Sequence, residues 1–129
     1  MKHHTICVFG EAEKGELKTP IFCTSLLDLF VHLGHPPKES LGIEFAIQFL
    51  EKDRDLIFFR VSEEGFLIED YLAGFAVLEK KALPLKIGAL CLPGVGDPTI
   101  LEAAAPTCLA HRSLLLISEK DLYDYLTNC

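Results

Sequence analysis

Residues 86–102 read KIGALCLPGVGDPTILE and carry the pattern that decides the fold. An apolar, strand-like run over 86–92 ends in a turn with two glycines, and an amphipathic helix is predicted from Thr99. Such a turn lets backbone N–H groups come close to a ligand, and the helix N-terminus adds a partial positive charge. The stretch therefore predicts a strand–turn–helix unit and is the first place to look for a site.

The alternation of strands and helices continues along the whole chain. Apolar, β-rich runs predict strands, and helical periodicity with capping residues predicts the helices between them. The predicted strands cover 5–9, 20–23, 55–61, 86–92 and 113–117, and the predicted helices cover 26–33, 42–52, 68–81, 99–112 and 118–126. We expect an α/β fold, a three-layer Rossmann-like sandwich with a mainly parallel sheet of four to five strands. Residues 1–129 are predicted to form a single domain.

Capping and breaking residues give three local expectations. Ser40 is expected to cap the second predicted helix, because a serine hydroxyl accepts a hydrogen bond from a free N–H of the first turn. Pro106 is expected to kink or restart the helix over 99–112, because proline lacks the N–H that a helix interior uses. Gly74 lies in the middle of the third predicted helix and is expected to allow close packing of that helix on the sheet.

The five cysteines are an odd number and include no CxxC pair, so reduced thiols are expected. Cys7 and Cys91 lie in predicted strands, where a free cysteine behaves as a small apolar residue. Cys23 and Cys129 are the two that are expected at the surface.

Composition limits the classes of partner. The net charge of −7 argues against nucleic acid, which needs a basic surface. Hydrophobic residues make up 50% of the chain, so we expect apolar surface to meet another copy in a homo-oligomer; the alternative is a dense parallel-sheet core inside a monomer. No apolar run approaches the roughly 20 residues that span a bilayer, and no signal-peptide pattern is present at the start. A cytoplasmic protein that contacts no membrane is expected.

Ligands of open α/β sheets bind outside the carboxyl ends of the strands, near the point where strand order reverses. In this chain those ends lead into residues 10–15, 62–65, 94–97 and 118–119. The candidate ligand-binding residues are Gly10, Glu11, Lys14, Gly94, Gly96, Asp97 and Thr99. Thr99 can donate a hydroxyl hydrogen bond, and Lys14 can neutralise charge. The alternative is a plain connector in which Asp97 caps the helix and Pro98 takes its first position.

Carboxylates gather at the same predicted edge of the sheet: Glu11, Glu13, Glu63, Glu64 and Asp97. Together they repel a bare phosphate. One solution is a hard divalent cation such as Mg²⁺, held by Glu63 and Glu64, that bridges the carboxylates to a phosphate. Another is a ligand that is cationic or a neutral, sugar-like molecule, and the alternative to both is a solvated acidic rim.

Residues 93–102 read PGVGDPTILE. This segment resembles the Pro-Gly-Gly-x-Gly-Thr-x-x-Glu signature of the LOG/lysine-decarboxylase-like family, within the SLOG group of Rossmann-like nucleotide-binding proteins. The matching residues are Pro93, Gly94, Gly96, Thr99 and Glu102, with Val95 at the second glycine and Asp97-Pro98 inserted before the threonine. The resemblance implies binding of a nucleotide or nucleoside phosphate, with Glu102 in the place of the family's catalytic glutamate.

These observations predict a small protein that binds a nucleotide or related phosphorylated metabolite at the C-terminal edge of its sheet. Two alternatives stay open: a non-catalytic, oligomeric interaction subunit, and a metal-assisted hydrolase or transferase that uses the acidic mouth. Burial of residues 94–99 against a neighbouring subunit would exclude the first prediction. Loss of metal binding on replacing Glu63 or Glu64 by glutamine would support the hydrolase or transferase.

Overall fold

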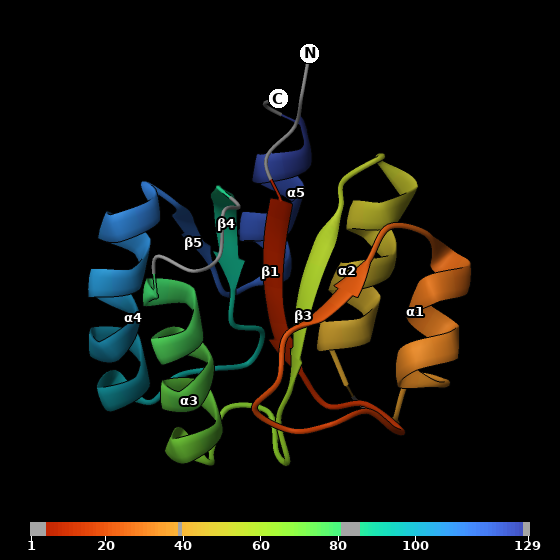
Figure 1. Cartoon of the computed structure of the whole chain (residues 1–129). Helices are drawn as coiled ribbons and strands as arrows, with labels where there is room; N and C mark the ends of the chain where they lie inside the picture. Colours follow the sequence, from red (N-terminus) through yellow and green to blue (C-terminus); the bar gives the residue numbers. More distant parts are fainter. Residues whose placement is uncertain (1–4, 39, 81–85, 128–129) are drawn as a thin grey trace.

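A computed structural model describes residues 5–38, 40–80 and 86–127 of the chain, and its central feature is a five-stranded sheet covered by helices (Figure 1). The strands are β1 (Thr5–Gly10), β2 (Ile21–Cys23), β3 (Leu56–Arg60), β4 (Ile87–Cys91) and β5 (Leu114–Leu116). The helices are α1 (Leu26–Leu33), α2 (Gly42–Glu51), α3 (Ile68–Glu79), α4 (Pro98–His111) and α5 (Glu119–Thr127). Each predicted element is present, with its ends within two residues of the prediction.

The strand order is β2-β3-β1-β4-β5, and all pairs are parallel except β2 with β3. The chain passes from β1 to β3 on one side and then returns across β1 to β4 on the other. Strand order therefore reverses between β1 and β4, which makes this pair the topological switch point. The loops after β1, β3 and β4 meet at one edge of the sheet, at the bottom of Figure 1. The predicted α/β sandwich with a mainly parallel sheet is confirmed.

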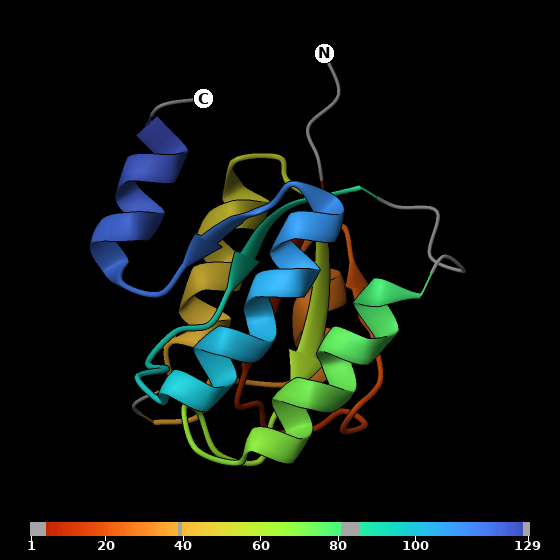
Figure 2. The same ribbon diagram turned by 90° about the vertical axis from the view of Figure 1, so that its left-hand side faces the viewer.

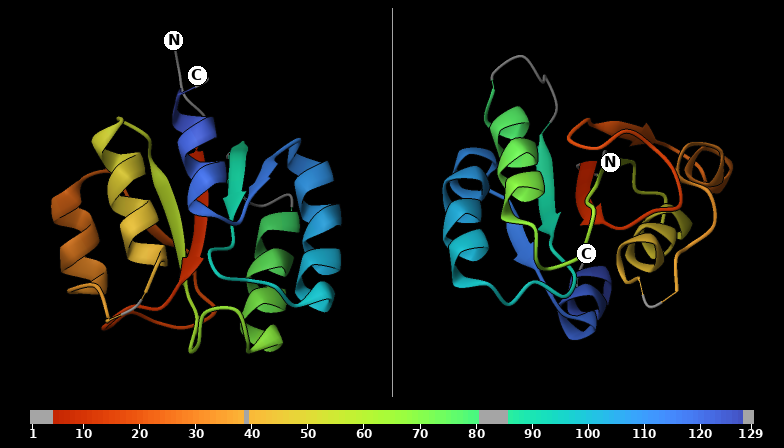
Figure 3. Two further views of the ribbon diagram at one scale, coloured as in Figure 1. Left: turned by 180° about the vertical axis from the view of Figure 1, so that it is seen from behind. Right: turned by 90° about the horizontal axis from the view of Figure 1, so that it is seen from below.

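Both faces of the sheet are covered, which explains why its strands are continuous apolar runs. Ile6 and Val8 of β1 belong to the core under α1, α2 and α5, whereas Cys7 and Phe9 belong to the core under α3 and α4. Figure 3 shows the two layers of helices on opposite sides of the sheet. No helix in the described part of the chain is both long and apolar enough to cross a membrane.

An aromatic cluster lies between the sheet and α3. The ring centroid of Phe9 lies 4.9 Å from that of Phe59, 5.2 Å from that of Phe75 and 5.5 Å from that of Tyr71. A Cβ added at Gly74 would collide with the Phe9 ring, so glycine is required there by the close approach of α3 to β1. The expectation for Gly74 is confirmed.

The expectation for Ser40 is wrong, and so is the expected restart of a helix at Pro106; the expected kink at Pro106 stays a prediction. The N-cap of α2 is Leu41, which makes no side-chain capping bond, and the Ser40 hydroxyl instead donates to the carboxylate of Glu64. Helix α4 is continuous through Pro106 and does not restart there. Proline has no N–H, so the carbonyl of Glu102, four residues earlier, has no helical hydrogen-bond donor. Because Pro106 is exposed, this carbonyl lies on the side of the helix that water can reach.

The cysteines also need one correction. Cys7 and Cys91 are buried as expected, but Cys23 is buried as well, because β2 turns it into the core beneath α1. Cys129, and the predicted end of the third helix at Lys81, lie outside the described residues.

Candidate functional site

Glycines allow four segments of the chain to approach one another in pairs at the C-terminal edge of the sheet. A Cβ at Gly10, at the end of β1, would lie 2.6 Å from the Cα of Gly42, at the start of α2. A Cβ at Gly65, after β3, would lie 2.7 Å from the carbonyl oxygen of Gly94, after β4. Gly10, predicted to bind a ligand, is therefore needed for the contact between β1 and α2.

The carboxylate of Glu64 occupies the N-terminus of α2. It accepts hydrogen bonds from the Ser40 hydroxyl (2.6 Å) and from the N–H groups of Glu11 (2.8 Å), Leu41 (3.0 Å) and Gly42 (3.2 Å). We call these four donors the Glu64 cradle. The first N–H groups of a helix have no partner within it, and the helix dipole favours a negative charge there. Glu64 therefore acts as an internal anion that ties the β3–α3 loop to α2.

Glu11 returns this contact. Its carboxylate accepts a hydrogen bond from the N–H of Glu64 (2.9 Å), so the two residues join the β1 and β3 loops through a reciprocal pair of bonds. Glu63 is exposed and takes no part in this reciprocal pair of hydrogen bonds. In the described part of the chain, no group of three or more His, Cys, Asp or Glu side chains is placed to hold a metal ion. The acids at this edge thus serve largely as partners of backbone N–H groups.

Arg60 holds the loop that follows β1. Its Nε donates to the carbonyl of Ala12 (3.2 Å) and its Nη1 donates to the carbonyl of Gly15 (2.7 Å). The side chain is half-buried, so its charge lies close under the acidic loops. Arg60 therefore fixes the course of this loop and offsets part of its negative charge.

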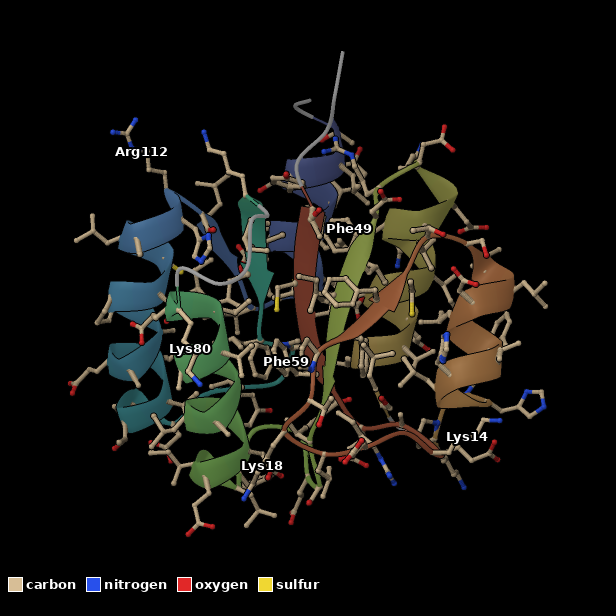
Figure 4. All side chains as sticks on the ribbon, in the orientation of Figure 1. Lys14, Lys18, Phe49, Phe59, Lys80 and Arg112 are labelled. Atoms are coloured by element: carbon tan, nitrogen blue, oxygen red, sulfur yellow. The ribbon has the colours of Figure 1, made fainter. Side chains whose placement is uncertain are left out.

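Lys14 lies away from the glycine turn. Its N–H donates to the carbonyl of Leu33 at the end of α1 (3.2 Å), and neighbouring Glu13 accepts from the N–H of His35 (3.1 Å). In Figure 4 the Lys14 side chain extends into solvent beneath α1, on the opposite side of the molecule from α4. The structure does not bring Lys14 together with the β4–α4 turn.

The β4–α4 turn has the features of a well-formed connector. The N–H of Val95 donates to the carbonyl of Leu92 (3.2 Å), and Val95 is buried in the core. Asp97 caps α4 by accepting from the N–H of Thr99 (2.8 Å), and Pro98 is the first helical residue. The predicted cap and the predicted proline position are confirmed.

The two glycines of this turn are exposed, and only one of them has a backbone conformation that favours glycine. Gly94 has a φ of +76°, a conformation that favours glycine, whereas the φ of Gly96 lies outside that range. A Cβ at Gly96 would meet no heavy atom within 4 Å. The packing of the described residues therefore gives no reason for glycine at position 96.

Thr99 and Glu102 occupy different positions on α4. Thr99 is exposed in the first turn, next to the capped end. Glu102 is exposed on the side of the helix opposite the buried Ile100 and Ala104, so it faces away from the sheet. Gly94, Gly96 and Thr99 are therefore exposed with the half-buried Asp97 between them, and Glu102 lies one helical turn beyond Thr99.

Sequence reasoning missed the residues that support the middle loop from α3. The buried Tyr71 hydroxyl accepts a hydrogen bond from the N–H of Gly65 (2.7 Å), and the Asp70 carboxylate accepts from the N–H of Ser62 (2.8 Å). Burial raises the pKa of Tyr71 to about 12. A signal was present, since both side chains fall in the first turn of a predicted helix, directly after an acidic loop.

We compared the chain with protein-family models, with curated proteins and with solved structures, and no match was found. The resemblance of residues 93–102 to the LOG signature stays a prediction.

Proposed function

We propose that the chain binds a nucleotide or a related phosphorylated metabolite at the C-terminal edge of its sheet, on the β4–α4 turn. The observation that carries the proposal is Gly96. This residue is exposed, its backbone conformation does not require glycine, and a Cβ there would have open space around it. A glycine that internal packing does not need is expected where another molecule comes close to the backbone.

The position of the turn supports the same proposal. It follows β4, at the switch point where open α/β sheets bind their ligands. The exposed backbone of Gly94 and Gly96 and the hydroxyl of Thr99 can supply donors to phosphate or sugar oxygens, and the N-terminus of α4 adds a partial positive charge. Since Asp97 already caps this helix, we expect the ligand to lie across the turn and not on the helix axis.

Charge determines the form in which a phosphate would bind. Asp97 lies in the turn itself and exposed Glu63 lies in the neighbouring loop, whereas Lys14 is on the far side of the molecule. A bare phosphate would be repelled at short range. We therefore expect the ligand to bind as its Mg²⁺ complex. In such a complex phosphate oxygens and water supply most of the metal ligands, and the protein supplies few.

The proposal covers binding and assigns no reaction. Glu102 faces away from the sheet, one helical turn beyond Thr99, so a general base at that position would need a ligand that extends along α4 from the turn. The thiols of Cys7, Cys23 and Cys91 are free and buried, which is in keeping with a reducing cytoplasmic location.

Thermal unfolding with a panel of nucleotides, each with and without Mg²⁺, tests the proposal. A binding nucleotide should raise the melting temperature, and more strongly with Mg²⁺. Gly96→Val should leave the unliganded fold unchanged but weaken binding about 10- to 100-fold, because a clash of this kind costs about 1–3 kcal/mol. Ala76→Val on the exposed side of α3 is the control. The proposal fails if no nucleotide shifts the melting temperature, or if Gly96→Val binds as well as the unchanged chain.

A further inference from the structure

Helix α4 is apolar on its outer side as well as on its inner side. Ile100 and Ala104 face the core, yet the opposite side presents the exposed residues Ala105, Pro106 and Leu109. Leu109 is 80% exposed. Figure 2 shows α4 on the outside of the molecule, with no other element in front of it. A helix that is apolar all round is normally covered on both sides, so the outer face of α4 lacks a partner in the single chain.

A groove runs beside this exposed leucine. It has a volume of about 460 Å³ and is open to solvent, and its walls include Leu101, Ala105 and Cys108 of α4 and Leu115 of β5. Strand β5 is the last strand of the sheet, so no further strand covers this side. A protruding leucine next to an apolar groove is the arrangement that a two-fold contact between identical surfaces uses, because each copy supplies both parts.

The charges along α4 fix the direction of such a contact. Glu102, Ala105, Leu109 and Arg112 follow one another at intervals of three and four residues and are all exposed, so they form one stripe. The stripe has an acidic residue at one end and a basic residue at the other, about 15 Å apart along the helix axis. Neither Glu102 nor Arg112 forms an ion pair within the described residues, and Arg112 extends outward at the end of α4 in Figure 4.

We propose that a second copy of this chain covers the outer face of α4, with the two α4 helices antiparallel around a two-fold axis. The axis crosses the outer face at the level of Thr107, whose own side chain is buried on the core side. In this arrangement Leu109 of each copy enters the groove of the other over Ala105. Each Glu102 then lies opposite Arg112 of the other copy, which gives two symmetric ion pairs. A parallel arrangement would place Glu102 against Glu102 and Arg112 against Arg112, and like charges oppose it.

This interface leaves the proposed ligand site open. The stripe begins at Glu102, one helical turn after Thr99, and Gly96 lies in the turn before the helix. A failure of the dimer would therefore say nothing against ligand binding, and a failure of ligand binding would say nothing against the dimer.

Sedimentation velocity of the whole chain tests the interface. We expect a species of twice the 14.3 kDa chain mass. Leu109→Glu should give monomers, and its exposed position should leave the fold intact. Leu27→Glu places the same charge on the exposed face of α1, where Leu27 is 73% exposed, and should leave the dimer unchanged. A monomer up to the hundred-micromolar range for the unchanged chain, or a dimer of Leu109→Glu, would overturn the proposal.

A charge exchange tests the antiparallel arrangement. Glu102→Arg or Arg112→Glu alone turns both symmetric pairs repulsive and should weaken dimerisation about tenfold. The double variant restores opposite charges at both contacts and should recover the affinity. If the double variant is no better than the weaker single variant, the proposed arrangement is wrong.

Discussion

Replacing Glu64 by alanine removes the one acceptor that the four donors of the Glu64 cradle share. The N–H groups of Glu11, Leu41 and Gly42 would lose this acceptor at once, and the Ser40 hydroxyl would keep only its long contact with the carbonyl of Glu11 (3.4 Å). Ser40 is only 4% exposed, so water cannot easily take the place of the carboxylate there. The variant should therefore destabilise the fold although Glu64 belongs to no helix or strand.

The size of the effect follows from these contacts. A hydrogen bond to a charged group contributes about 1.5–3 kcal/mol, and loss of a helix cap costs about 1 kcal/mol. Because Glu64 is only half-buried, water will replace part of what is lost at the N–H groups. We expect Glu64→Ala to lower the free energy of unfolding by about 2–4 kcal/mol. Glu64→Gln keeps one carbonyl oxygen as acceptor and should lose about half as much.

Urea unfolding followed by circular dichroism measures this loss. Glu63→Ala is the matched control, because Glu63 is the exposed neighbour and should change the free energy by less than about 0.5 kcal/mol. Protein concentration must be equal in all samples, since dimerisation would add to the apparent stability. A double-mutant cycle of Glu64→Ala with Ser40→Ala should give a coupling free energy of about 1 kcal/mol.

The reasoning is refuted if Glu64→Ala destabilises the chain no more than Glu63→Ala does. A coupling free energy near zero between positions 40 and 64 would show that the hydrogen bond between their side chains adds nothing to stability.

Two further predictions concern the support of the site from α3. Burial raises the pKa of Tyr71 to about 12, above the value of about 10 for a free tyrosine. As the pH rises, the tyrosine of the unfolded chain therefore ionises before that of the folded chain. This contribution to stability is complete below about pH 10 and falls as the pH rises towards 12. Tyr71→Phe should flatten the dependence of melting temperature on pH in this range, and an equal decline in both proteins would contradict the assignment. Gly74→Ala gains about 1 kcal/mol of helix propensity, yet the collision of its Cβ with Phe9 should cost about 1–3 kcal/mol; an increase in melting temperature would show that the contact is loose.

The fold could be predicted because its signals are local. Ser25 caps α1 by accepting from the N–H of Asp28, and Gly34 ends the same helix, as their positions in the sequence indicate. Asp97-Pro98 marks the start of α4 in the same way. The sheet order could not be predicted, because strand pairing depends on contacts between distant parts of the chain.

The acidic edge could be predicted only in part. The sequence indicates that Glu11 and Glu64 come to the same end of the sheet, but not that each accepts hydrogen bonds from the backbone of the other. Ser40 shows the limit most clearly: local pattern predicts a helix cap, and the tertiary fold gives its hydroxyl to a carboxylate 24 residues away. The predicted acidic mouth is therefore partly an internal hydrogen-bond network, whereas the glycine turn keeps its exposed backbone.

An amide NMR titration with nucleotides in the presence of Mg²⁺ tests the ligand site most directly. If the β4–α4 turn binds the ligand, the backbone amides of Gly94, Gly96, Asp97 and Thr99 should shift first and saturate together. In Gly96→Val the remaining shifts should need about 10- to 100-fold more nucleotide to saturate. Shifts confined to other surfaces, or no saturable shift with any nucleotide, would contradict the assignment of the site to this turn.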